Sequence, residues 1–336
     1  MQTLAKTPLR TFFKGLSRWR RAAGLAVALA VSTGVHAGPV VDIGYQKGTP
    51  LTLLKARGTL ERALAQKGYS VRWTEFAAGP PLLEAMNAGA IDIGYTGSPP
   101  PIFAQAAGSR LVYLAAEPAG PQNEALIVRA GSPLKRVADL KGRTVALARG
   151  SSSHYLLVAA LAQAGLRYED VKVVFLSPAD ARAAFDSGHV DAWAIWDPYL
   201  AVVQQAEPTR TLADYGSGIA QPYSFFLGAP DFVKAHRDVV ATVLQAVKEG
   251  DAWVLAHRDE TTQLIARETG VPPPVVAYFL ARSRFGVLPL DNAILASQQR
   301  VADVFFAQKL IPHAVNVAQA AVPVAVPGAA LANTGP

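Results

Sequence analysis

Residues 84–99 read EAMNAGAIDIGYTGSP, and residues 183–198 read AAFDSGHVDAWAIWDP. The two stretches repeat one pattern at a constant offset, 188 − 89 = 99. The matched pairs are Gly89/Gly188, Ile91/Val190, Asp92/Asp191 and Pro99/Pro198. Upstream, an apolar strand pattern runs into a glycine loop twice, at Ile43–Gly48 and at Val145–Gly150. We therefore predict two similar lobes with a ligand held between them.

Residues 1–37 have the pattern of a secretory signal peptide. Six lysines and arginines precede an apolar run, Ala22–Val31, and small residues at Val35 and Ala37 suit signal-peptidase cleavage. The apolar run is shorter than the roughly 20 residues that a bilayer requires, which disfavours the alternative of a retained membrane anchor. Arg20-Arg21 leaves export by the Sec or the twin-arginine route open. We expect the mature protein to be periplasmic.

Charge and cysteine content exclude several classes of function. Without residues 1–37 the chain has 336 − 37 = 299 residues and 32 − 6 = 26 basic against 25 acidic groups. This near-neutral balance argues against nucleic-acid binding, which usually needs a basic surface. With no cysteine, the chain forms neither disulfides nor thiolate metal sites. We expect no metal and no cofactor.

Strand and helix patterns alternate along the chain, and this alternation predicts an α/β fold with parallel sheets. Glycines end the helices, and proline or serine begins them. The predicted strands of the first part are 40–44, 71–76 and 91–95, and its helices begin at residues 50 and 80. The second part repeats the plan with strands 144–148, 172–176 and 190–195 and with helices that begin at residues 152 and 178.

Two breaker-rich stretches, 117–124 and 215–222, are predicted to connect the lobes. The second lobe would then be residues 122–221, and the first lobe residues 38–121 together with 222–317. Amphipathic helices at 231–257, 260–268, 274–283 and 292–308 are expected to pack back on the first lobe. Residues 318–336 are rich in Ala, Val, Pro and Gly without periodicity, so we expect a disordered tail.

The candidate ligand site lies where strands lead into helices, because ligands of open α/β sheets bind beyond the carboxyl ends of the strands. Four loops qualify: 45–49, 96–99, 149–154 and 196–199. They are rich in glycine and small hydroxyl residues at helix starts, where free N–H groups and the helix dipole favour an anion. Ser151, Ser152 and Ser153 together exceed the needs of helix capping and suit an oxyanion with several oxygens.

Other residues in these loops have plainer interpretations. A single serine before a helix is often only an N-cap, and Thr96-Gly97-Ser98 could be such a helix entry. On an alternating strand Trp193 and Trp196 cannot both face inward, and Trp196, at the strand tip, is the better candidate for a pocket wall. His154, Asp92 and Asp191 are expected to be structural.

A serine-dependent esterase is the alternative from another class. Gly150-Ser151-Ser152-Ser153-His154 lacks the second glycine of a nucleophile elbow, and no dinucleotide, Walker or zinc-protease motif occurs. We therefore expect a binding protein and no enzyme.

Several blocks resemble one family, the periplasmic aliphatic sulfonate-binding subunits of ABC importers. They span most of residues 40–317, and they are Ile43–Gly48, Pro100–Gly108, Gly150–His154, Pro178–Phe185 and Asp191–Tyr199. The resemblance implies a two-lobed α/β fold, that of a type II periplasmic binding protein, with two domains joined by a hinge. It implies capture of a sulfonate for sulfur acquisition and delivery to a permease in the inner membrane.

Related oxyanions remain alternatives: sulfate esters, taurine, phosphonates and nitrate. We expect a monomer. The pocket residues that the resemblance implies are Gln46, Thr96, Gly97, Ser151, Ser152, Ser153, Trp196 and Asp197, and we add Ser98.

Two positions depart from the family pattern. Ser98 stands where the family usually has an acidic residue after Thr-Gly, so we predict a weaker preference for amino-substituted sulfonates such as taurine. Ala148-Arg149 replaces an amide-Lys pair before the serines. Arg149 either adds positive potential near the pocket mouth or is simply solvated.

Overall fold

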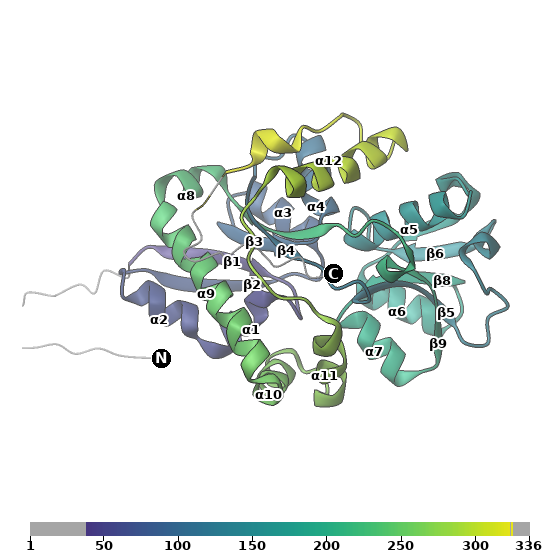
Figure 1. Ribbon diagram of the computed structural model, residues 1–336, viewed down its shortest axis with the longest axis horizontal. Coiled ribbons are helices and arrows are strands. Elements are labelled where there is room, and N and C mark those ends of the chain that lie inside the picture. Colours follow the sequence, from purple (N-terminus) through teal and green to yellow (C-terminus); the bar gives the residue numbers. More distant parts are fainter. Residues whose placement is uncertain (1–37, 323, 325–336) are drawn as a thin grey trace, which may run out of the picture. The chain divides into compact units, whose positions relative to one another are not determined.

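The computed structural model describes residues 38–322 and residue 324 (Figure 1). The predicted signal peptide, residues 1–37, lies outside the described residues, as does the chain from residue 325. Within the described part, no helix combines the length and apolar character needed to cross a membrane.

The strands form two five-stranded sheets. The first has the order β2-β1-β3-β10-β4 and the second the order β7-β6-β8-β5-β9. The strands of the first sheet are β1 (Val40–Tyr45), β2 (Ser70–Glu75), β3 (Ile93–Thr96), β4 (Val112–Pro118) and β10 (Tyr223–Gly228). Those of the second are β5 (Glu124–Arg129), β6 (Thr144–Leu147), β7 (Lys172–Phe175), β8 (Ala192–Trp196) and β9 (Thr209–Asp214).

Both sheets are mixed, which corrects the prediction of parallel sheets. The strands β2-β1-β3 and β7-β6-β8 are parallel, as the alternation of strands and helices requires. However, β10 runs antiparallel to β3 and β4, and β5 runs antiparallel to β8 and β9. These two strands lie next to the connecting stretches between the sheets, so their direction is set by how the chain crosses and not by local pattern.

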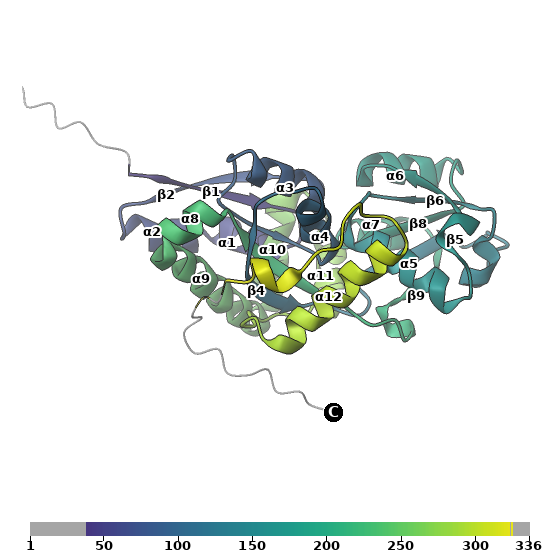
Figure 2. The same ribbon diagram turned by 90° about the horizontal axis from the view of Figure 1, so that it is seen from above.

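The helices lie on the faces of the sheets (Figures 1 and 2). Gly58 divides the helix predicted to begin at residue 50 into two helices, and His236 divides the helix predicted at 231–257. The helices are α1 (Pro50–Arg57), α2 (Thr59–Ala65), α3 (Gly79–Asn87), α4 (Pro99–Ala106), α5 (Ser152–Gln163), α6 (Pro178–Asp186), α7 (Tyr199–Ala206), α8 (Pro230–Ala235), α9 (Arg237–Ala256), α10 (Arg258–Thr269), α11 (Pro273–Arg282) and α12 (Asn292–Ala307). Short 3₁₀ helices are Val137–Leu140, Tyr168–Asp170, Tyr215–Ser217 and Val317–Ala320.

The two aspartates of the sequence repeat have the same structural role, as predicted. The Asp92 carboxylate accepts a hydrogen bond from the Asp42 N–H at 2.9 Å, and Asp92 N–H donates to the Asp42 carbonyl at 2.8 Å. In the second sheet Asp191 makes the same two bonds with Thr144, at 2.8 and 2.9 Å. Asp92 thus joins β1 to the segment that leads into β3, and Asp191 joins β6 to the segment that leads into β8.

The apolar core is continuous from one sheet to the other through α4, α5 and α12. Phe305 of α12 packs edge-on against Phe103 of α4, with ring centroids 4.9 Å apart, and against His154 of α5 at 5.3 Å. In both ribbon views α12 passes near α4 and reaches toward α5 (Figures 1 and 2). The C-terminal segment therefore contacts elements of both sheets, and not of the first alone.

The chain remains ordered beyond residue 318, where the sequence predicts the disordered tail to begin. Val317–Ala320 form a 3₁₀ helix, and Val317 is fully buried. The Val322 N–H donates to the Tyr113 carbonyl of β4 at 3.0 Å. This edge-strand pairing orders residues whose composition alone suggests no structure.

Candidate functional site

A cavity of about 140 Å³ lies at the carboxyl ends of the parallel strands of both sheets. The four loops that the sequence singles out each contribute to its lining. The sequence-predicted site residues that line it are Gln46, Gly97, Ser98, Ser151, Ser152, Trp196 and Asp197. Among the described residues, Thr96 and Ser153 are fully buried beside it and are not part of the lining.

Gln46, in the loop after β1, is held by β3 and by the start of α1. Its Nε2 donates to the Tyr95 carbonyl of β3 at 3.0 Å. Its own carbonyl accepts from the hydroxyls of Thr49 and Thr52, at 2.8 and 2.9 Å. An amide nitrogen carries two N–H donors, so one remains for a ligand in the cavity.

The start of α4 offers fewer donors than a helix start normally does. Its first three residues, 99–101, are all prolines and carry no N–H. The Ser98 hydroxyl donates to Gln298 of α12, whose Nε2 returns a bond to the Ser98 carbonyl at 2.7 Å. The Thr96 hydroxyl donates to the Gly97 carbonyl at 2.9 Å. What this loop can offer an anion is therefore the backbone N–H groups of Gly97 and Ser98.

The start of α5 is a better anion site. Ser151 is the N-cap residue, and its hydroxyl donates to the Ala148 carbonyl at 2.7 Å and lies 3.4 Å from the Ser153 hydroxyl. Ser152 begins the helix and lines the cavity. The N–H groups of the first turn and the dipole of this 12-residue helix point at that part of the cavity.

His154 supports the serine loop from inside, as the sequence suggests. Its Nδ1 accepts from the Gly150 N–H at 3.2 Å, so the ring proton is on Nε2, which lies 2.8 Å from the Tyr168 hydroxyl. Burial, with a smaller contribution from Arg149, lowers the pKa of His154 to about 4. The imidazole is therefore neutral at pH 7, and both of its nitrogens are engaged in holding the loop.

The loops of the two sheets approach each other closely at two glycines. A Cβ on Gly97 would lie 3.0 Å from the Cβ of Ser152. A Cβ on Gly150, whose φ is +67°, would lie 3.1 Å from the ring of Phe103. Only glycine permits this approach, which brings the N–H groups of the β3 loop next to the start of α5.

Asp197, at the tip of β8, is already paired. Arg282, the last residue of α11, donates from Nε and Nη2 to the two carboxylate oxygens at 2.7 and 2.6 Å. The Ala201 N–H of α7 adds a bond of 3.0 Å. Burial raises the pKa of Asp197 to about 6, against the lowering by Arg282 and Ala201. The carboxylate thus fixes α11 to the loop, and neighbouring Trp196 supplies a wall of the cavity.

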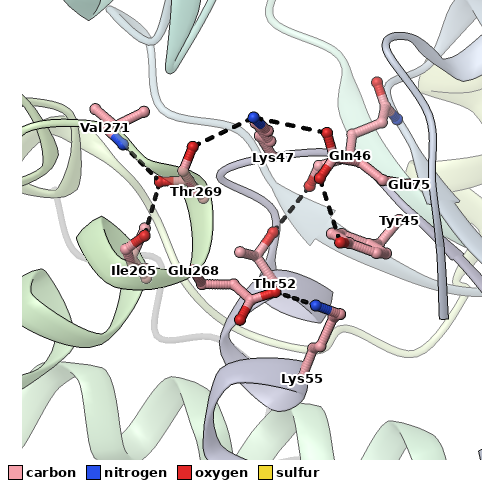
Figure 3. Close-up of polar contacts among 10 residues, drawn as sticks. All are labelled: Tyr45, Gln46, Lys47, Thr52, Lys55, Glu75, Ile265, Glu268, Thr269 and Val271. Carbon is pink, nitrogen blue, oxygen red and sulfur yellow. Dashed lines mark hydrogen bonds and ion pairs between the residues drawn. The ribbon is translucent and has the colours of Figure 1, made fainter.

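Lys47 at the cavity mouth is also tied into the protein (Figure 3). Its Nζ donates to the Thr269 carbonyl at the end of α10 at 3.2 Å and lies 3.7 Å from Glu75. Lys55 of α1 forms an ion pair with Glu268. A cation at a helix C-terminus is favourable, so these contacts fasten the loop after β1 to α10.

Three buried carboxyl side chains that the sequence did not predict as site residues line the cavity: Glu117, Glu124 and Asp251. Glu117 is the penultimate residue of β4 and Glu124 is the first residue of β5, in the stretch that the sequence predicts only as a connection between the lobes. The position of Asp251 in the sequence could have indicated a ligand site. It continues the buried stripe of α9 through Val247 and Val254, so an acidic residue occupies an apolar helix face.

Glu124 lies beside the start of α5. Burial raises its pKa to about 7, while the hydroxyls of Ser152, Ser153 and Tyr215 lower it by smaller amounts. In the described structure its Oε1 and the Tyr215 hydroxyl have no hydrogen-bond partner. Below about pH 7 the carboxyl is protonated and can donate a hydrogen bond to an anion.

The far part of the cavity is largely apolar. Its walls come from α1, α9, α10, α11 and the segment that follows α11, namely Leu53, Val254, Ile265, Leu280 and Phe285. The exposed Arg284 lies at its edge. Within the described residues, no cluster of three His, Cys, Asp or Glu side chains suits a metal ion.

Known proteins share both the sequence and the fold. The profile of the NMT1/THI5-like family matches residues 65–261. The aliphatic sulfonates-binding protein of Escherichia coli (strain K12) is 44% identical over 301 residues, covering 88% of this chain and 93% of that protein. The crystal structure of the periplasmic aliphatic sulphonate binding protein SsuA from Escherichia coli matches with a TM-score of 0.76 and 43% identity, over 84% and 97% of the two chains.

Two further relatives extend the comparison. The alkanesulfonate-binding protein SsuA from Xanthomonas axonopodis pv. citri, bound to MOPS, matches with a TM-score of 0.80 and 41% identity, over 85% of this chain and 99% of that one. The taurine-binding periplasmic protein of Escherichia coli (strain K12) is 28% identical over 275 residues, covering 79% and 81% of the two chains.

These matches confirm the resemblance seen in the sequence and the periplasmic binding protein fold. The chain belongs to the NMT1/THI5-like family and, within it, to the group of periplasmic aliphatic sulfonate-binding proteins.

Proposed function

We propose that the protein captures aliphatic sulfonates in the periplasm and delivers them to the permease of an ABC importer for sulfur acquisition. The observation that carries this proposal is the 43% identity to the Escherichia coli sulphonate-binding protein over 97% of that chain. The cavity supports it, because a helix N-terminus faces one end and an apolar hollow forms the other. A sulfonate head and a hydrocarbon chain need this combination.

In the proposed complex the sulfonate lies at the start of α5. The proposed donors are the N–H groups of the first turn, the Ser152 hydroxyl, the remaining N–H of Gln46 and the Gly97 N–H, and Ser152, Gln46 and Gly97 all line the cavity. Several donors suit the three oxygens of a sulfonate. Trp196 covers the head group, and the hydrocarbon chain extends into the hollow beside Leu53 and Val254.

The two sheets are proposed to be the cores of two lobes, residues 38–121 with 222–317 and residues 122–221. The donors of Gly97 and Ser152 belong to different sheets, so one anion engages both only when the loops meet. The ligand then stabilises the closed arrangement through contacts that the open one lacks. A permease can distinguish the loaded protein by this change.

We propose binding without catalysis. An esterase that pairs a serine with a histidine would need His154 as the base for the Ser152 hydroxyl, but both nitrogens of His154 are hydrogen-bonded elsewhere. The expected monomer is also a proposal, and light scattering of the purified protein tests it. Turnover of a panel of esters that Ser152→Ala abolishes would contradict the binding role.

Calorimetric titration tests the function. Ethane-, butane- and hexanesulfonate should bind, and nitrate and methylphosphonate should bind more weakly. Loss of a hydrogen bond to a charged partner, about 1.5–3 kcal/mol, predicts a roughly 10- to 100-fold weaker affinity in Ser152→Ala. Ser187→Ala is the matched control, because Ser187 is an exposed residue at the C-terminal cap of α6. If only nitrate or the phosphonate binds, the assignment to sulfonates is wrong.

A further inference from the structure

Glu117 and Asp251 both line the cavity and lie close enough to interact electrostatically, and the proposed sulfonate contacts do not use them. Glu117 comes from the end of β4 and is 4% exposed, and Asp251 comes from α9 and is 5% exposed. Two acidic groups in a pocket for an anion call for a physical reason, since burying a carboxyl without a charge partner is costly.

Partners for these carboxyls are few in the described structure. Glu117 accepts a hydrogen bond from the Tyr95 hydroxyl. Asp251 receives the Gly286 N–H, and its Oδ2 is buried with no hydrogen-bond partner. The influences on the two groups include no Lys or Arg side chain. A carboxyl that is nineteen-twentieths buried, lines a cavity and has a free oxygen is arranged for a ligand, not for the fold.

The surroundings define which ligand group fits. Leu53, Val254 and Ile265 line the same cavity, and Val254 lies one turn from Asp251 on α9, so a group bound at Asp251 is largely removed from water. In such a setting two carboxyls favour a cation with hydrogen-bond donors, because they replace its lost hydration. An ammonium group at the end of an alkyl chain meets this requirement, whereas a methyl group leaves the free oxygen of Asp251 unpaired.

We propose that Glu117 and Asp251 form a subsite for a protonated amine, so that the preferred ligands are sulfonates carrying an ammonium group on the distal end of the chain. This inference rests on the proposed sulfonate site at α5, which holds the other end of the ligand. It reverses the prediction, drawn from Ser98, of a weaker preference for amino-substituted sulfonates. The acidic side chains come from β4 and α9 instead of from the loop after β3.

Isosteric ligand pairs test the subsite. In 3-aminopropane-1-sulfonate and 4-aminobutane-1-sulfonate, an ammonium replaces the terminal methyl of butane- and pentane-1-sulfonate. Calorimetry at pH 7 should show at least one amine binding about tenfold more tightly than its methyl partner, the fold-change for one charged hydrogen bond. In the Glu117→Gln/Asp251→Asn double variant the ratio should fall to about one or below, while the alkanesulfonates still bind.

Glu249→Gln is the matched control, because Glu249 is on the same helix but exposed and bonded to Gln245. It should keep the wild-type ratio. Binding of the alkanesulfonates reports that each variant is folded. If the alkanesulfonates bind and neither amine is preferred, or if the double variant keeps the preference, the subsite is refuted and the proposed function stands. If no sulfonate of either kind binds, the proposed function fails and the subsite with it.

Discussion

Replacing Arg282 by methionine should destabilise the protein by about 3–5 kcal/mol, because it leaves the buried charge of Asp197 without its partner. The side chains of Arg282 and Asp197 are only 12% and 8% exposed. The guanidinium makes two parallel bonds to the carboxylate, at 2.7 and 2.6 Å, and a third bond of 2.9 Å to Gln204 of α7. Methionine retains most of the apolar length of arginine, so the loss measures mainly the charge and its hydrogen bonds.

The magnitude follows from burial. An exposed ion pair contributes about 0–1 kcal/mol, whereas removal of one partner of a buried pair costs about 3–5 kcal/mol. In Arg282→Met the Asp197 carboxylate still accepts the hydrogen bond from the Ala201 N–H, which satisfies one lone pair of Oδ1. The partnerless carboxylate then takes up a proton more readily, since burial already raises its pKa to about 6. The loss should therefore be larger at pH 8 than at pH 5.

Urea unfolding followed by tryptophan fluorescence and circular dichroism measures the effect. The double variant Asp197→Asn/Arg282→Met should recover at least half of the loss, since it removes the uncompensated charge. Arg284→Met, a neighbouring exposed arginine, should change the free energy of unfolding by less than about 0.5 kcal/mol. A loss below about 1 kcal/mol for Arg282→Met would show that Asp197 does not depend on this pair and is free for the ligand, contrary to the structure.

Three further outcomes follow from the site. Gly97→Ala places a Cβ 3.0 Å from that of Ser152, so calorimetric titration should show an affinity for sulfonate that is about tenfold lower. The melting temperature should be nearly unchanged, because the clash is relieved when the two loops move apart. The pKa of Glu124 is raised to about 7, so its carboxyl is neutral below that pH and repels the sulfonate above it. The affinity of the wild-type protein for sulfonate should therefore fall up to about tenfold from pH 6 to pH 8. In Glu124→Gln this contribution to the pH dependence of the affinity should be absent. The folded protein lowers the pKa of His154 to about 4, so as the pH falls from about 6.5 toward 4 the unfolded chain binds a proton that the folded protein does not. The free energy of unfolding therefore decreases over that range. In urea titrations this decrease should be about 3 kcal/mol smaller for His154→Gln than for wild type.

The repeat in the sequence predicts much of the fold because its residues act locally. Asp92 bonds the backbone of β1, and Asp191 bonds the backbone of β6 in the other sheet. Glycines and prolines mark helix ends through backbone geometry alone, as at Gly89 after α3 and at Pro178 at the start of α6. The antiparallel strands β5 and β10 could not be predicted in this way, since their direction depends on where the chain crosses between sheets.

The composition of the site is harder to predict because partners arrive from distant segments. The Ser98 hydroxyl is engaged by Gln298, 200 residues further along the chain, and the Asp197 carboxylate is engaged by Arg282, 85 residues away. Both side chains are thereby occupied within the protein. Asp251 could have been found, because its place on the buried stripe of α9 conflicts with its charge. Such a conflict between pattern and residue type is a useful signal for a ligand site.

A crystal structure of the protein with butane-1-sulfonate tests the central claim most directly. We expect the sulfonate oxygens within hydrogen-bond distance of Ser152 and of the Gly97 N–H, and the butyl chain beside Leu53 and Val254. Butanesulfonate bound away from the start of α5, for example in the surface groove lined by Tyr155 and Ile219, would contradict the account.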